Sequence, residues 1–225
     1  MKTLKQYLTK LLIINKTSYK YFPETKKELQ NIIKERIDQE GPEVNLNNID
    51  TSNITDMYEL FGDFNNFNGN ISQWDVSNVN NMHGMFLDCE LFNQNISAWD
   101  VSNVTNMSYM FNLCEEFNQD IFNWDVSKVI DMNGMFMFCE NFNQNISAWD
   151  VSNIPDMNGM FYGCKAFNKD ISSWNVSKVN DMEAMFAYCE SFNQNISNWD
   201  VSKVKNSDDM FFGCHIEEKY KPHFT

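Results

Sequence analysis

Apolar and polar positions repeat along residues 64–216 with a period of 25 residues. Each unit reads approximately F-N-Q-N/D-I-S-x-W-D-V-S-N/K-V-x-N/D-M-x-x-M-F-x-x-C-x-x, and residues 92–116 are a clean copy. Every tryptophan occupies one position of this unit: Trp74, Trp99, Trp124, Trp149, Trp174 and Trp199. Every cysteine occupies another: Cys89, Cys114, Cys139, Cys164, Cys189 and Cys214. A fixed period of this length predicts a solenoid, in which each unit buries its apolar residues only against its neighbours.

Two shorter periodicities alternate within each unit. Residues 95–97 alternate between polar and apolar, which predicts a short strand with Ile96 pointing inward. Apolar residues then recur at intervals of three and four over residues 104–114, which predicts one or two turns of helix. We therefore predict an α/β fold: a right-handed solenoid with short parallel strands and short helices. Strands are expected near residues 69–73 and every 25 residues thereafter, with the Trp, Met, Phe and Cys positions inside.

The chain divides into four predicted segments. Residues 1–22 form a basic, amphipathic leader whose apolar side chains fall at helical spacing. Residues 23–43 are predicted to form an N-terminal capping helix, with one apolar stripe and Gly41 as its stop. The solenoid of about seven 25-residue repeats spans residues 44–214, and residues 215–225 form a C-terminal cap or tail. An open solenoid needs covers of this kind at its ends.

The net charge of −14 narrows the range of expected partners. Acidic residues are concentrated in the repeats, and a strongly acidic body repels phosphate backbones, so nucleic-acid binding is not expected. No apolar run approaches the ~18 residues that span a bilayer. The apolar run at residues 11–14 is shorter than a signal-peptide core of roughly 7–15 residues, and no lipid-anchor cysteine lies near it. We predict a cytoplasmic protein; the alternative is the virion or the cell surface, reached by a non-standard route.

The six cysteines admit three interpretations. Equivalent residues on adjacent turns would lie roughly 5 Å apart, but their side chains would point in parallel, which is poor disulfide geometry. A metal site is disfavoured, because there is no C-x-x-C pair and the histidines do not recur with the unit. We favour a buried column of free thiols.

No pattern typical of an active site occurs in the sequence. There is no Ser/His/Asp triad, no phosphate-cradling glycine loop and no pair of carboxylates in distinct environments, and the chain has only 8 glycines. A calcium ladder along the Asp or Asn before each helix is also disfavoured, since the glycine-rich loop of such repeats is missing. We expect no catalytic residues, no metal ligands and no cofactor, so the protein is not predicted to be an enzyme.

Residues 99–111 read W-D-V-S-N-V-T-N-M-S-Y-M-F. This phrase resembles the units of BspA-type leucine-rich-repeat surface proteins, and above all their 25-residue variant in mycoplasma lipoproteins. The resemblance covers roughly residues 44–214 and implies a parallel-stranded leucine-rich-repeat arc that acts in binding or adhesion, without catalytic residues. Over a shorter stretch, residues 1–8 resemble the leaders that direct internal head proteins of T4-like bacteriophages into the capsid.

Two polar columns flank the inward isoleucine of each predicted strand. The candidates for a concave face are Asn95, Ser97, Asp120, Phe122, Asn145 and Asp170. One interpretation is that these columns stabilise the sheet through amide and hydroxyl ladders. The other is that they form a regular ligand-binding surface. An ice-binding array is less compatible, because Phe122 and the aspartates interrupt a uniform lattice.

A second set of positions varies within the strict repeat, so the core does not dictate it. A helical wheel places Met137 opposite the inward face, which centres near Met132 and Cys139. The candidates for a partner-binding surface are Leu87, Tyr109, Leu113, Met137, Phe138, Tyr162, Tyr188 and Phe212. Apolar and aromatic residues at such positions favour a contact surface; the alternative is that they seal adjacent turns.

Together these patterns favour a non-catalytic module that mediates protein–protein interaction or adhesion. The alternative is a phage-encoded protein that is virion-associated or packaged in the capsid as a structural or cargo protein. The expected partner is a protein, and no membrane span is expected.

Overall fold

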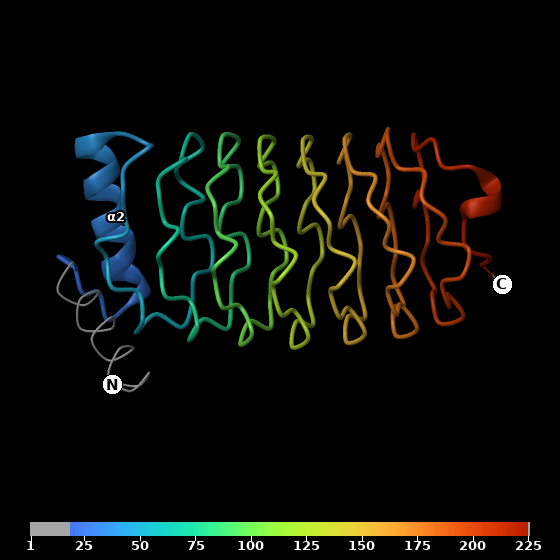
Figure 1. Ribbon diagram of the computed structural model, residues 1–225, viewed down its shortest axis with the longest axis horizontal. Helices are drawn as coiled ribbons and strands as arrows, with labels where there is room; N and C mark the ends of the chain where they lie inside the picture. Colours follow the sequence, from blue (N-terminus) through green and yellow to red (C-terminus); the bar gives the residue numbers. More distant parts are fainter. Residues whose placement is uncertain (1–18, 225) are drawn as a thin grey trace, which may run out of the picture.

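The computed structural model describes residues 19–224, and successive turns of the chain lie side by side in one row (Figure 1). Two helical elements occur in this part: α2, Lys26–Glu40, at one end of the row, and the 3-10 helix η1, Glu218–Tyr220, at the other. Residues 19–224 form no extended strand, but isolated parallel bridges join equivalent positions of successive units, such as Asp56 with Asn81. We call the row of units the stack. The predicted amphipathic leader lies outside the described residues up to residue 18.

The core of the stack consists of apolar columns, each filled by one residue from every unit. The six tryptophans are 3–5% exposed, and the Met and Phe side chains of the central units are fully buried. Phenylalanine rings form a continuous series, with Phe86 and Phe92 4.0 Å apart within one unit and Phe86 and Phe111 5.6 Å apart in successive units. Such ring contacts add stabilisation beyond burial alone, and they hold the units in register.

Buried polar side-chain atoms also join the units. Each indole N–H donates to a carbonyl of the preceding unit; the distance from Trp149 Nε1 to Ile121 O is 3.1 Å. The Cys139 thiol donates in the same way to Phe111 O, with Sγ 2.9 Å from the oxygen. All six cysteines are free, and five of them are buried. These bonds pair polar atoms that would otherwise be unsatisfied in an apolar core.

Residues 104–114, whose spacing predicts a helix, instead form consecutive tight turns. Tyr109 and Leu113 have left-handed φ angles of 55° and 64°, which a right-handed helix does not contain. Hydrogen bonds join residues three apart, for example Asn112 N to Tyr109 O at 3.1 Å. Apolar side chains recur at three and four residues because the turns themselves have that length.

Residues 107–113 and their equivalents carry the main-chain hydrogen bonds between units, and we call them the ladder segment. Every second N–H group, from Met107 to Leu113, donates to a carbonyl oxygen 24 residues later at 2.8–2.9 Å. Residues 95–97, for which a strand is predicted, form a turn instead. The segment with strand-like pairing is therefore the one whose pattern resembles a helix.

Helix α2 covers one end of the apolar core. Thr25 caps its N-terminus through a side-chain hydrogen bond of 3.2 Å, and Gly41, with φ 87°, follows its last turn. Leu29 and Ile33 are fully buried in the cluster that includes the first unit. The apolar stripe predicted for residues 23–43 thus faces the stack.

Candidate interaction surface

Four aromatic side chains from successive units form a row along the stack. Phe138 and Tyr162 meet edge to face, with ring centroids 5.0 Å apart. Tyr162 with Tyr188, and Tyr188 with Phe212, have the same geometry at 5.4 Å and 5.3 Å. We call these four residues the aromatic row. Phe138, Tyr188 and Phe212 are 36%, 44% and 56% exposed, so the row lies outside the core, unlike the tryptophans.

Glycines in the following unit make room for the row. A Cβ atom at Gly163 would lie 2.7 Å from Phe138 Cδ1, and one at Gly213 would lie 3.0 Å from Tyr188 Cδ1. Both distances are shorter than ordinary van der Waals contact, so the two rings lie directly on glycine backbone. Both glycines also have left-handed φ angles, 71° and 69°, which most side chains disfavour.

The aromatic residues that precede these glycines occupy the same strained conformation. Phe138 and Tyr188 have φ angles of 59° and 58°, and a left-handed conformation costs a non-glycine residue about 1–2 kcal/mol. Glycine fills the equivalent positions in two other units, at 163 and 213. Backbone strain that is retained at an exposed aromatic residue is a reason to suspect a functional role.

The predicted candidates Leu87, Leu113 and Met137 are half-buried and fill space between units. A Cβ atom at Gly159 would lie 2.7 Å from Met137 Cε, so this methyl group rests on the next turn. These three residues fit the alternative prediction, that large side chains seal adjacent turns. The aromatic row fits both alternatives, since each ring contacts the next unit and yet remains partly exposed.

Tyr109 lies apart from the row, in a second aromatic cluster nearer α2. His83 stacks on Tyr58 with ring centres 4.9 Å apart and meets Tyr109 edge to face at 5.7 Å. Lys26 Nζ lies 4.7 Å from the centre of the Tyr58 ring, in a cation–π contact that links α2 to this cluster. Tyr58 and His83 are missing from the predicted surface, because their column is polar in most units and was not selected by the apolar pattern.

The predicted concave-face residues form local turns rather than ladders between units. Asn95 Oδ1 accepts hydrogen bonds from Ser97 N at 3.0 Å and from Ser97 Oγ at 2.7 Å. Asp120 Oδ1 accepts one from Phe122 N at 2.9 Å. The same main-chain bond, two residues ahead, is made by Asn145 and Asp170. These oxygens stabilise Asx turns within their own units, so the ladder interpretation does not describe them.

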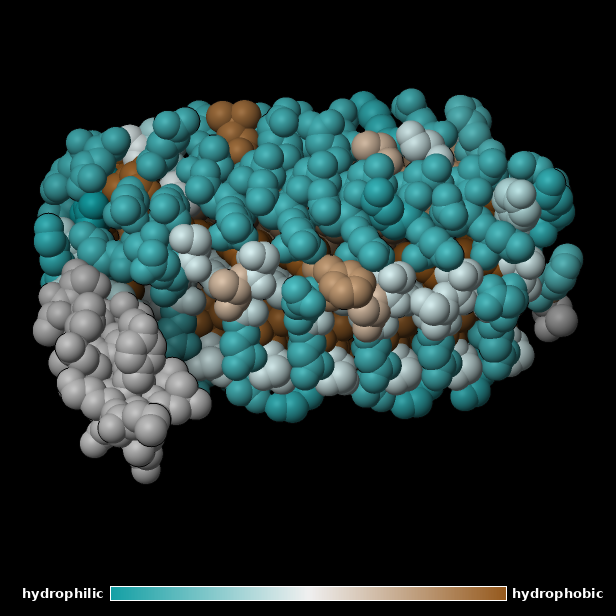
Figure 2. Space-filling view, in the orientation of Figure 1, coloured by the Kyte–Doolittle hydropathy of each residue, from teal (hydrophilic) through white to brown (hydrophobic). Residues whose placement is uncertain are grey.

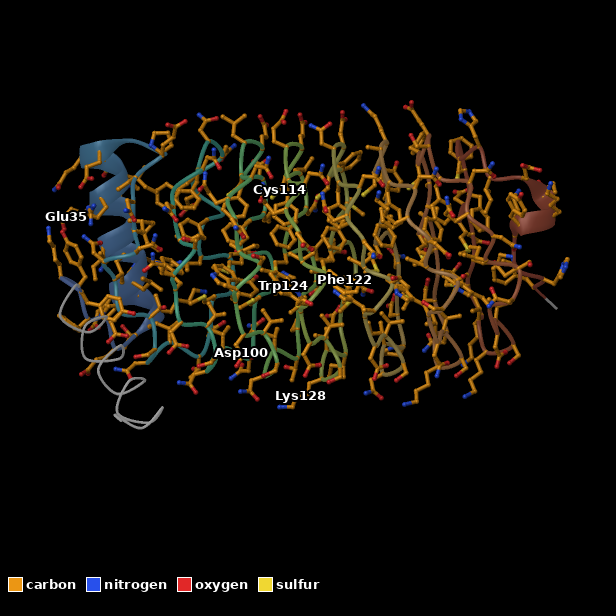
Figure 3. All side chains as sticks on the ribbon, in the orientation of Figure 1. Glu35, Asp100, Cys114, Phe122, Trp124 and Lys128 are labelled. Carbon is orange, nitrogen blue, oxygen red and sulfur yellow. The ribbon has the colours of Figure 1, made fainter. Side chains whose placement is uncertain are left out.

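Phe122 interrupts an otherwise mostly polar face of the stack (Figures 2 and 3). Its side chain is 37% exposed, whereas serine occupies the equivalent position of the neighbouring units. Shallow hollows lie among the turns of these columns, and one of about 280 Å³ is lined by Asp170, Asn195 and Ser197 together with neighbouring polar residues. Such hollows offer hydrogen-bonding groups but little apolar contact area.

Local contacts set the titration of the side chains. Hydrogen bonds from the serine two residues later lower the pKa values of Asp100, Asp125 and Asp150, the side-chain bond being the larger cause. Burial raises the pKa values of the Cys114 and Cys139 thiols. The aspartates are therefore ionised at neutral pH, and the two thiols are held in their unreactive protonated form.

Residues 19–224 bring together no group of three His, Cys, Asp or Glu side chains that could hold a metal ion. In the same part of the chain, no helix is both long and apolar enough to cross a bilayer. The surface does offer aromatic contact area in the row, and hydrogen-bonding groups on the face that carries Phe122.

One family model matches the chain twice. Its description is "Mycoplasma protein of unknown function, DUF285", and it matches residues 27–137 and 114–221. The chain belongs to this family. The DUF285 matches run from α2 to the C-terminal tail, and they confirm the predicted relation to mycoplasma repeat proteins at the level of the family. No curated protein and no solved structure matches the chain.

Proposed function

We propose that this DUF285 protein is a non-catalytic binding module whose aromatic row contacts a protein partner. The observation that carries the proposal is a continuous line of exposed rings that contact one another at 5.0–5.4 Å. Exposed aromatic residues are common singly on protein surfaces, but a contiguous group is typical of an interaction site.

The geometry of the row suits binding for an energetic reason. Aromatic side chains bring large contact areas with few rotatable bonds, and they are enriched among the residues that dominate interfaces. Here each ring is already held by its neighbour and by the turn beneath it, so little side-chain entropy remains to be lost on association. Truncating such a residue typically costs more than about 1 kcal/mol of binding free energy.

The finer classification belongs to the same proposal. We propose that the stack is a right-handed solenoid of the leucine-rich-repeat class, related to BspA-type repeats, and that binding or adhesion is its role. Parallel bridges between equivalent residues of successive units support a solenoid. The free thiols suit a reducing compartment, which favours the cytoplasm.

Partner capture with matched variants tests the proposal. The full-length protein is immobilised and incubated with an extract of its source cells, and the bound proteins are compared by quantitative mass spectrometry. The double variant Tyr188→Ser, Phe212→Ser should lose at least one bound protein by tenfold or more, which corresponds to about 1.4 kcal/mol. Phe122→Ser removes an exposed ring outside the row and should leave that protein bound.

Equal retention by the wild type and the double variant would contradict a role for the row. Equal loss in Phe122→Ser would indicate non-specific adsorption to exposed rings instead. Melting curves of the variants show whether each remains folded, so that loss of capture is not mistaken for unfolding.

A further inference from the structure

The hydrogen bonds of the ladder segment all run in one direction along the stack. In the unit before the last, the N–H groups of residues 182, 184, 186 and 188 donate to carbonyls of the last unit at 2.7–2.9 Å. All of these N–H groups therefore point toward the C-terminal end, and all of the paired carbonyls point the opposite way. An ordinary parallel strand has N–H and C=O groups alternating along each edge.

The last unit consequently ends in donors only. Its equivalent N–H groups belong to Ser207, Asp209, Phe211 and Gly213, and none of them meets an acceptor within residues 19–224. We call these groups the donor row. Aligned peptide N–H groups without partners carry partial positive charge, as at a helix N-terminus, and alternating right- and left-handed residues form anion-binding concavities.

The two ends of the stack differ in how they are covered. Helix α2 lies across the N-terminal end, whereas at the C-terminal end the chain returns through η1 to one side of the last turn (Figure 1). This return pairs Tyr220 O with Ile196 N at 3.0 Å, away from the donor row. Between the return segment and the donor row lies an open cavity of about 680 Å³.

The lining of this cavity indicates what it accepts. Ser207, Asp209 and Phe211 border it from the donor row, and Lys221 and His223 border it from the return segment. Lys221 also pairs with Glu218, so the basic groups are partly neutralised. The unpaired N–H groups therefore supply much of the attraction for oxygen atoms, and Phe212, which is 56% exposed, supplies apolar contact beside them.

We propose that the donor row binds the C-terminal carboxylate of an extended polypeptide from a partner. A chain end offers two carboxylate oxygens followed by main-chain carbonyls, which matches several donors in a line, whereas a side-chain carboxylate offers only two oxygens. Main-chain donors are a recurrent means of recognising terminal carboxylates. This site goes beyond the proposed function of the aromatic row and shares only Phe212 with it.

Three small peptides distinguish the sources of the oxygens. The first is acetyl-Gly-Ala-Ala-Phe with a free carboxylate, the second is the same peptide with a C-terminal amide, and the third is acetyl-Gly-Ala-Glu-Phe amide. Each is titrated into the full ¹⁵N-labelled protein, and amide shifts are followed by NMR. The free acid should shift the amides of the donor row, namely Ser207, Asp209, Phe211 and Gly213, and the neutral amide should not.

Two substitutions sharpen the test. Asp209→Gly removes a carboxylate from the cavity at a residue whose φ of 55° suits glycine, so the free acid should bind about two- to fivefold more tightly. Lys221→Glu should weaken binding by a similar factor. The matched controls are Ala184→Gly, at the same position one unit earlier, and Lys203→Glu, the same charge change outside the cavity; neither should alter the affinity.

An absence of shifts at the donor row with the free acid overturns the proposal. Equal shifts with the Glu-containing amide overturn the assignment to a chain end. Because the readout is local to the last unit, failure here leaves the aromatic row untested and unaffected, and loss of partner capture by the row leaves this site standing.

Discussion

Left-handed residues determine the path of the chain at the residue scale. Each unit has two such positions, represented by Tyr109 and Leu113, and these turn the backbone so that every second N–H group faces the next unit. Glycine at many of the equivalent positions avoids the strain that other residues incur there. The recurrence of glycine at 84, 134 and 159 is the signal in the sequence that distinguishes these turns from a helix.

Gly163→Ala should destabilise the protein by about 1–3 kcal/mol, because the new Cβ meets Phe138 at 2.7 Å and the φ of 71° is strained for alanine. Ala184→Gly, at a φ of 52°, should be neutral or slightly stabilising, since it relieves strain of the same kind. Urea denaturation of the two variants measures the difference. A Gly163→Ala variant as stable as the wild type would show that the ring moves aside without cost.

The thiols act as buried hydrogen-bond donors rather than as reactive groups. Cys139→Ala should cost about 1–2 kcal/mol, because it removes a buried sulfur and the donor to Phe111 O. Cys139→Ser, which keeps a donor, serves as the matched comparison. Adding a reductant to the wild type should leave its melting temperature unchanged; a large fall would reveal a structural disulfide, whose loss typically costs about 2–5 kcal/mol.

At the scale of elements, the unit combines a ladder segment with a series of Asx turns. The period, the buried Trp, Met, Phe and Cys columns and the position of α2 follow from the sequence, because a repeat constrains which residues face inward. The local path does not follow, because turns that join residues three apart give the same apolar spacing as a helix. Residues 104–114 and 95–97 show this: their patterns predict a helix and a strand, and both form turns.

The predicted surface divides in the same way. Phe138, Tyr162, Tyr188 and Phe212 come together in space, because positions that vary within a repeat stay stacked from unit to unit. Tyr109 lies in another cluster, because the wheel used to place these residues assumes a helix that does not form. The donor row depends on main-chain direction, which side-chain patterns do not encode.

The Asx turns predict a dependence of stability on pH. The pKa values of Asp100, Asp125 and Asp150 are lowered from 3.8 in the folded protein by their serine partners. The stabilisation is therefore fully present above about pH 4 and is lost as the pH falls through the lowered folded-state values. Denaturant midpoints measured from pH 6 to pH 2 should decrease over the acidic part of this range.

Replacing the three aspartates by asparagine provides the control. Asn175 already occupies the equivalent position in one unit and accepts the same bonds from Ser177, at 3.2 Å and 2.7 Å. The triple variant should fold and should lose less stability on acidification than the wild type. An identical pH profile would assign the acid sensitivity to other carboxylates.

For the whole molecule, the unequal covering of the two ends is the main determinant of assembly. The carbonyl groups of Asp56, Tyr58 and Leu60 accept no hydrogen bond within residues 19–224, and they belong to the unit that α2 covers. At the other end the donor row is open. The uncovered first unit of one copy would thus complement the last unit of another, and α2 blocks that contact.

Removing residues 1–43 should therefore convert the protein into end-to-end oligomers, since an uncovered heterologous contact of this kind does not close on itself. Analytical ultracentrifugation of the truncated and full-length proteins measures the effect. The same truncation combined with Phe212→Asp and Gly213→Pro should remain small, because it damages the opposite end. A truncated protein that is folded and monomeric would contradict this account of α2.

The one-way ladder gives the molecule a direction, and with it a graduated length. Adjacent units are spaced like neighbouring strands, at about 4.8 Å, so inserting or deleting one whole unit moves the two ends apart or together by one such step and leaves both ends chemically unchanged. A partner that contacted α2 and the last unit at once would in effect count the repeats. Within the 25-residue period, selection can set that distance only in whole steps, as on the marks of a ruler.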